Sequence, residues 1–121
     1  DGTTPLWSAA ETGEGSLAAL LLDHAAPIDA ADGAGRSPLW IAAKRGHAEV
    51  AELLLRRGAI VNRRANSEAT PLFIASARGH ELVVRLLLAN DARVDRADRS
   101  GTTPLMVSAE RSRLMVVATL L

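Results

Sequence analysis

Three arginines recur along the chain at one constant interval: Arg45, Arg78 and Arg111, with Thr12 at the corresponding earlier position. A guanidinium is planar and presents a fork of N–H donors, so it binds carboxylates through paired hydrogen bonds. Residues at a fixed spacing in a repeating fold lie at similar positions along one face. We call these three arginines the basic stripe, and they predict recognition of an acidic segment of a partner protein.

Four other basic side chains lie near the stripe in the sequence or in loops that would flank it. They are Arg36, Lys44, Arg64 and Arg99. With the stripe they form the set of candidate partner-binding residues. Two features oppose this interpretation: Glu11 and Glu110 lie beside the stripe, and repeated arginines can serve only to keep a surface soluble.

The titratable residues do not form a pattern that predicts catalysis, a cofactor or a bound metal. His47 and His80 occupy equivalent positions at the start of two predicted helices, and His24 lies in another element. Zinc needs three or four ligands within about 2 Å, whereas equivalent residues of stacked repeats lie about a helix diameter apart. We therefore expect the histidines to cap helices. Asp29, Asn62 and Asp95 share one loop position, where hydrogen bonding within a turn is expected.

One short motif resembles a dinucleotide-binding fingerprint. It is Gly13-x-Gly15-x-x-Ala18, with Asp32 downstream. That fingerprint requires a preceding β-strand, because the pyrophosphate is held between a strand and the start of a helix. The residues before Gly13 instead read as a helix. We therefore expect no nucleotide at this position and no enzyme activity from this chain.

An internal repeat must position all of these side chains. Prolines that follow Ser or Thr and precede Leu occur in one register, at Pro5, Pro38, Pro71 and Pro104. Nine residues after each hydroxyl come Gly13, Gly46 and Gly79, with Ser112 in the fourth place, and a Leu-rich segment follows. A fixed period of this length is typical of stacked repeat arrays.

The physical chemistry of one unit follows from its second copy, Ser37 to Ala59. Ser37 followed by Pro38 predicts an N-cap and a first helical residue, and Gly46 allows the left-handed conformation that ends a helix. A second helix should follow and should end at Gly58. Helices of about eight to ten residues are marginal alone, so neighbouring copies must cover their apolar faces.

This pattern resembles the ankyrin repeat. The matching residues are Asp32-x-x-Gly35-x-Ser37-Pro38-Leu39, Ala42-Ala43, Gly46-His47, Leu54-Leu55, Gly58-Ala59 and Asn62. The resemblance implies an all-α solenoid of stacked helix-turn-helix units with hairpin-like loops, which binds proteins through its concave face. The repeats would cover about 1–33, 34–66, 67–99 and 100–121 of a single array. Because the chain starts at Asp1 and stops within a predicted helix, we expect a segment of a longer chain, and the alternative role is scaffolding or addressing within a larger enzyme, channel or regulatory protein.

Several positions depart from the ankyrin pattern. Ala25 and Glu68 replace expected glycines, so altered turns are predicted there. Large apolar residues replace the usual histidine after Ser/Thr-Pro-Leu, at Trp7, Trp40, Phe73 and Met106. They would exchange a structural hydrogen bond for apolar bulk, and we favour packing between helices over an aromatic ladder that grips a ligand. Trp40, with a repeat on each side, should be better shielded than Trp7.

Composition and charge narrow the remaining possibilities. The 121 residues are 48% hydrophobic and include no cysteine, which excludes disulfides and leaves the redox compartment open. The net charge is zero, but residues 1–33 carry six acids and no base, while residues 34–66 carry seven bases and two acids. This uneven distribution of charge predicts electrostatic steering of a partner. The alternative is that these charges are simply solvated surface groups. We expect no nucleic acid partner, no membrane insertion, and a monomer that can associate end to end through Val116, Val117, Leu120 and Leu121.

Overall fold

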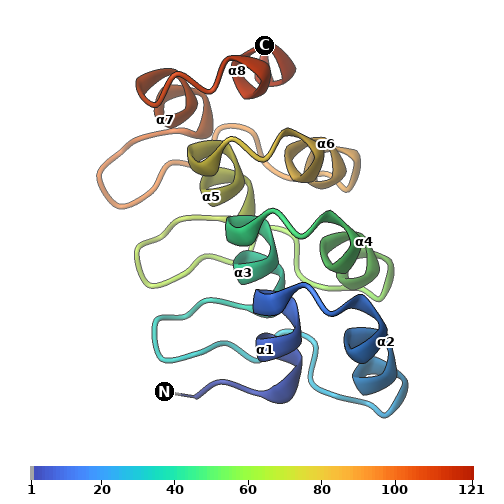
Figure 1. Cartoon of the computed structure of the whole chain (residues 1–121). Helices are drawn as coiled ribbons and strands as arrows, with labels where there is room; N and C mark the ends of the chain where they lie inside the picture. Colours follow the sequence, from blue (N-terminus) through green and yellow to red (C-terminus); the bar gives the residue numbers. More distant parts are fainter. Residues whose placement is uncertain (1) are drawn as a thin grey trace.

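The computed structural model of the protein describes residues 2–121, and over these residues it contains eight short helices and no strand (Figure 1). The helices form four consecutive pairs. Their bounds are α1 Pro5–Thr12 and α2 Gly15–Asp23; α3 Pro38–Arg45 and α4 Ala48–Arg56; α5 Pro71–Arg78 and α6 Glu81–Ala89; α7 Pro104–Glu110 and α8 Leu114–Leu120. The predicted all-α stack of helix-turn-helix units is therefore confirmed.

Each first helix begins with the predicted side-chain cap. In the four repeats a Ser or Thr hydroxyl accepts a hydrogen bond from the backbone N–H three residues later, and proline occupies the next position. The caps are Thr4 at 3.1 Å, Ser37 at 3.2 Å, Thr70 at 3.1 Å and Thr103 at 3.3 Å. One orphan amide of each helix start is satisfied in this way, and proline leaves none unpaired.

The first helices also end alike, even where glycine is missing. Gly46 has the left-handed φ of 75° that the pattern predicts, and Ser112 adopts a φ of 56° at the corresponding place after α7. For a residue with a Cβ this conformation costs about 1–2 kcal/mol. The repeat geometry therefore overrides the local preference of Ser112.

The expected changes in the turns at Ala25 and Glu68 are wrong. Both residues adopt positive φ, 64° and 66°, as the glycines of other repeats do. The Glu68 N–H donates to the Ala65 carbonyl at 2.8 Å, which matches the bond from Gly35 to the Asp32 carbonyl at 2.9 Å. The Ala25 N–H likewise donates to the Leu22 carbonyl as the Gly58 N–H does to that of Leu55. A replaced glycine therefore introduces local strain and not a different turn.

The helices lie in two layers, with α1, α3, α5 and α7 in one and α2, α4, α6 and α8 in the other, and the long loops project beside the first layer (Figure 1). Neighbouring helices of the first layer pack more closely than those of the second. Small buried residues such as Ala42, Ala43 and Ala75 permit this approach. A stack that is tighter on one side bends toward that side. We call the side formed by the first helices and loop tips the inner face.

The core runs continuously through the stack instead of forming one centre. Leu54 and Leu87 of the central second helices are fully buried, whereas Leu120 at the corresponding place of the last repeat is only partly buried. Val116 is 1% exposed and belongs to the core. The expectation that Val116 mediates end-to-end association is therefore wrong, because α8 turns it toward the stack.

Replacing Leu54 by Ala should lower the free energy of unfolding by about 2–5 kcal/mol, since a fully buried leucine leaves a cavity. Leu120→Ala should cost much less, because no following repeat covers that residue. Urea denaturation followed by circular dichroism measures both values. Equal losses at the two positions would contradict this description of the C-terminal repeat.

Candidate functional site

Hydrogen bonds between repeats place the ends of the first helices. His47 Nε2 donates to the Glu11 carbonyl at 3.0 Å, and His80 Nε2 donates to the Lys44 carbonyl at 3.0 Å. Arg113 takes the same role toward Ala77 at 3.1 Å. His47 and His80 therefore do not cap the helices that they precede, as their positions had suggested. Each instead bonds a carbonyl at the end of the first helix of the preceding repeat. The links from His80 and Arg113 fix the ends of α3 and α5, where Arg45 and Arg78 of the basic stripe lie.

The two indoles are buried structural groups. Trp7 Nε1 donates to the Arg36 carbonyl at 2.9 Å, and Trp40 Nε1 donates to the Ala69 carbonyl at 3.1 Å. Trp7 is 5% exposed, Trp40 is 6% exposed, and Met106 of the last repeat is 53% exposed. These values favour packing over a ligand-gripping ladder.

Two expectations about these indoles are therefore wrong. Trp40 is not better shielded than Trp7, because each indole leans toward the following repeat and is covered by that repeat. The polar link was also not lost, since the indole N–H supplies the hydrogen bond between repeats. Met106 is exposed because no repeat follows it in the structure.

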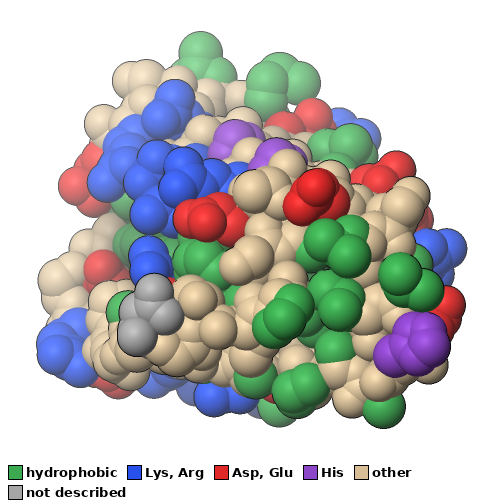
Figure 2. Space-filling model, turned by 60° about the horizontal axis from the view of Figure 1, so that its bottom comes forward, with side chains coloured by type: hydrophobic (Ala, Val, Ile, Leu, Met, Phe, Trp, Pro, Cys, Tyr) green, Lys and Arg blue, Asp and Glu red, His purple; other side chains and the backbone are tan. Residues whose placement is uncertain are grey.

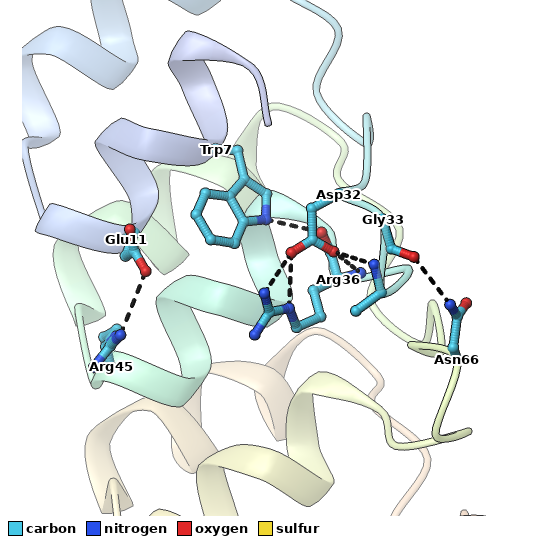
Figure 3. Close-up of polar contacts among 8 residues, drawn as sticks. Trp7, Glu11, Asp32, Gly33, Arg36, Arg45 and Asn66 are labelled. Atoms are coloured by element: carbon cyan, nitrogen blue, oxygen red, sulfur yellow. Dashed lines mark hydrogen bonds and ion pairs between the residues drawn. The ribbon is translucent and has the colours of Figure 1, made fainter. Parts of the chain in front are cut away.

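Arg36 joins the two indoles to a buried carboxylate. Its Cζ lies 5.6 Å from the centre of the Trp7 ring and 5.9 Å from that of Trp40, and its Nη2 lies 2.6 Å from Asp32 Oδ2 (Figure 3). Burial raises the pKa of Asp32, but hydrogen bonds from the Arg36 side chain and from the backbone N–H groups of Arg36 and Ala34, with the Arg36 charge, lower it below its usual value. Arg36 is thus largely committed to structure.

Four cations interact with one another, and we call them the basic cluster: Lys44 and Arg45 at the end of α3, Arg78 at the end of α5, and Arg36 in the loop before α3. Lys44 Nζ lies 6.0 Å from the centre of the Trp40 ring. Burial lowers the pKa of Lys44, the charges of Arg78, Arg36 and Arg45 lower it further, and the Glu11 charge opposes them only in part. Figure 2 shows Lys and Arg side chains gathered on one side of the molecule.

The other candidate residues are placed differently. Arg64 Nη1 lies 3.2 Å from Glu68 Oε1, and Arg99 Nε lies 3.6 Å from Glu68 Oε2, so these two loop arginines converge on one carboxylate. Arg111 is exposed and has no ion pair among residues 2–121. The structure therefore brings four of the seven candidates together and leaves three outside the basic cluster.

Ion pairs across repeats were missed by the sequence reasoning. Arg45 Nη2 lies 3.3 Å from Glu11 Oε2 (Figure 3), and Arg57 Nη2 lies 2.8 Å from Asp23 Oδ1. In both pairs the base follows its acid by one position more than a full repeat, and that shared offset was the available signal. The acids of repeat 1 thus neutralise bases of repeat 2, which reduces the electrical polarity inferred from the sequence.

The loop position shared by Asp29 and Asn62 also forms hydrogen bonds between repeats. Asp29 Oδ1 accepts from the Ile60 N–H at 3.0 Å, and Asn62 Oδ1 accepts from the Arg93 N–H at 2.9 Å. The expectation of hydrogen bonding within the turn is wrong for both. Each donor lies in the loop of the following repeat, so these side chains tie one loop to the next.

No three His, Cys, Asp or Glu side chains come together as a possible metal site in the part of the chain that the structure describes. None of the helices within residues 2–121 has the length and apolar character needed to cross a bilayer. An open hollow between α2 and α4, lined by residues such as Gly15, Glu49 and Arg56, lies in the second layer of helices. The basic cluster lies on the other side, with the first layer of helices.

Single-tryptophan variants should show that both indoles are shielded. In Trp7→Phe and Trp40→Phe proteins, iodide should quench the remaining tryptophan much less than it quenches free N-acetyltryptophanamide, and the two quenching constants should be similar. The reason is the cover that each indole receives from the following repeat. Quenching of Trp7 at the rate of the free indole would show that this cover is absent in solution.

Asp32→Asn should destabilise the protein by about 1–3 kcal/mol at pH 7, because the charged hydrogen bonds to Arg36 are lost. The folded pKa of Asp32 is below its unfolded value, so this stabilisation is complete above about pH 4 and is lost as the pH falls through the folded pKa. Urea denaturation at several pH values should show the difference from wild type shrinking in acid.

The exposed loop residue Asp95 provides the matched control for Asp32. Asp95→Asn should change the unfolding free energy little at any of these pH values. A difference between wild type and Asp32→Asn that stays constant down to the acid limit would contradict the ionic role of Asp32.

A family model described as ankyrin repeats (3 copies) matches residues 1–65 and 61–121. A search of curated proteins found no match. The matched segments together cover the whole chain and coincide with the stack of helix pairs, their capped first helices and their cross-repeat hydrogen bonds. The chain belongs to the ankyrin repeat family.

Proposed function

We propose that this chain is a non-catalytic protein-interaction module whose inner face binds an acidic segment of a partner protein. Ankyrin repeats are in general protein–protein interaction modules, and this chain shares their architecture. The partner would contact the basic cluster first and the loop and stripe arginines around it. The proposed contact residues are Arg36, Lys44, Arg45, Arg64, Arg78, Arg99 and Arg111.

The observation that carries this proposal is unbalanced positive charge in the basic cluster. Asp32 neutralises Arg36, and Glu11 neutralises Arg45. Neither Lys44 nor Arg78 has an ion-pair partner in residues 2–121. Burial is the largest cause of the lowered pKa of Lys44, and repulsion from Arg78, Arg36 and Arg45 adds to it; an acidic group from outside the chain would relieve this repulsion.

The buried indoles direct the proposal toward polar recognition. Trp7 and Trp40 are buried, so a partner at the inner face would meet cations and not exposed rings. Two of these cations, Arg36 and Lys44, lie over the Trp40 ring. Recognition of this kind acts mainly on the association rate and weakens with salt. We also propose that residues 1–121 act as one array, because its core is continuous from repeat to repeat.

The double variant Arg45→Glu with Arg78→Glu should abolish or strongly weaken binding of a partner recovered by pull-down from cell extract. Both side chains are exposed, so the fold should survive, and circular dichroism verifies this. The association rate, measured by surface plasmon resonance, should fall more than the dissociation rate rises. Wild-type binding should also weaken between low and physiological salt.

Arg56→Glu with Arg93→Glu is the matched control, because it makes the same change in charge at two other exposed positions. Arg56 is the last residue of α4, and Arg93 lies in the loop after α6. It should leave binding nearly unchanged. Unchanged affinity in the Arg45 and Arg78 double variant would remove the stripe from this account. Equal loss in both double variants would reduce the effect to net charge.

A further inference from the structure

The ion pair between Glu11 and Arg45 defines a pair of positions that recurs in every repeat. Its equivalents one repeat later are Lys44 and Arg78. The backbone confirms the equivalence, since the carbonyls of Glu11 and Lys44 accept matching hydrogen bonds from the histidine of the next repeat. Repeats 1 and 2 have an acid and an arginine at these two positions, and repeats 2 and 3 have a lysine and an arginine, whose charges repel.

This substitution creates a local conflict of charge. Lys44 lies in the last turn of α3, where the helix dipole by itself favours a cation. Nevertheless the pKa of Lys44 is lowered, by burial first and then by Arg78, Arg36 and Arg45. The position lacks the negative charge that Glu11 supplies one repeat earlier.

We propose that Lys44 and Arg78 form a phosphoryl-binding site, which takes a phosphoserine or phosphothreonine of the partner. This inference rests on the proposed function and names the chemical group that the inner face recognises. The Trp40 ring lies near Lys44, and Arg36 and Arg45 flank the site.

The count of charges favours a phosphoryl group over a carboxylate. Of the four cations in the basic cluster, Lys44 and Arg78 have no ion-paired acid among residues 2–121, which leaves two unbalanced positive charges. A phosphoryl group carries about −1.5 to −2 charges at pH 7 and three acceptor oxygens. A single carboxylate carries only one negative charge, and in repeats 1 and 2 one arginine, Arg45, is enough to neutralise the Glu11 carboxylate. The dianion therefore matches what the site lacks.

The same comparison places the site between repeats 2 and 3. In repeat 1 the Glu11 carboxylate occupies the equivalent position and would repel an anion. In the last pair of repeats Ala77 stands opposite Arg111, so only one cation is present. One phosphoryl site per chain is expected.

The first measurement uses the full chain labelled with nitrogen-15 and carbon-13 and titrated with inorganic phosphate at constant ionic strength. The Arg78 Nε–H and Lys44 Cε–H signals should shift and saturate, and acetate should shift them much less. Equal shifts with phosphate and acetate would overturn the preference for a dianion.

The second measurement uses variants and a peptide library with random residues around a central phosphoserine. Lys44→Glu should weaken binding of this library roughly tenfold or more, since it removes charged hydrogen bonds. It should also raise the urea midpoint, because the introduced carboxylate would pair with Arg78 as Glu11 pairs with Arg45. Arg56→Glu, with the same sign of change on the exposed side of α4, should leave binding unchanged.

Glu11→Lys should produce a gain of phosphate binding, which misfolding of the variant could not produce. It places a lysine against Arg45 and should add a second phosphate site, visible as new shifts at Arg45 Nε–H. Undiminished binding of the phosphoserine library by Lys44→Glu would overturn the proposal. Binding to vesicles that contain phosphoinositides, without binding to the library, would overturn the choice of a phosphoprotein partner.

Phosphatase treatment of the captured partner separates this inference from the proposed function. Loss of binding after treatment supports the phosphoryl site. Unchanged binding after treatment, together with loss in the Arg45 and Arg78 double variant, would overturn the phosphoryl site and leave the acidic-segment function intact. Unchanged binding in the double variant would instead overturn that function.

Discussion

Each repeat completes the hydrogen bonding of the repeat before it, and the rest of the structure depends on this link. A helix of about two turns leaves its last carbonyls without internal partners. Here a ring N–H of His47 or His80 satisfies one of them from the next repeat. The link recurs from one repeat to the next, so it sets the stacking distance, and this distance decides which charged side chains meet. The basic cluster is a consequence of that register.

Much of the fold could be predicted because its signals are local and repeated. A Ser or Thr before proline specifies a helix start through its own hydroxyl, and the observed caps agree with that chemistry in every repeat. Ser112 and Glu68 show the limit of such reasoning. Both keep the positive φ of the glycines that they replace, and a propensity assigned to one residue does not predict this.

The candidate site was only partly predictable, because charge pairing depends on the orientation of long side chains across repeats. The spacing of Arg45 and Arg78 indicated a common face. It did not reveal that Glu11 neutralises Arg45, that Asp32 holds Arg36, or that Arg64 and Arg99 share Glu68. Once the neutralised candidates are set aside, Lys44, Arg78 and Arg111 remain, and of these Lys44 and Arg78 lie in the middle of the array.

The direction in which the indoles lean gives the array a polarity along its axis. Trp7 and Trp40 each depend on the repeat that follows, and Met106 is open for want of one. An added repeat would therefore make different contacts at the two ends of the stack. A unit joined after α8 would close an existing gap over Met106, whereas a unit joined before α1 would leave the cover of Trp7 as it is and would have to bring its own aromatic residue to be covered.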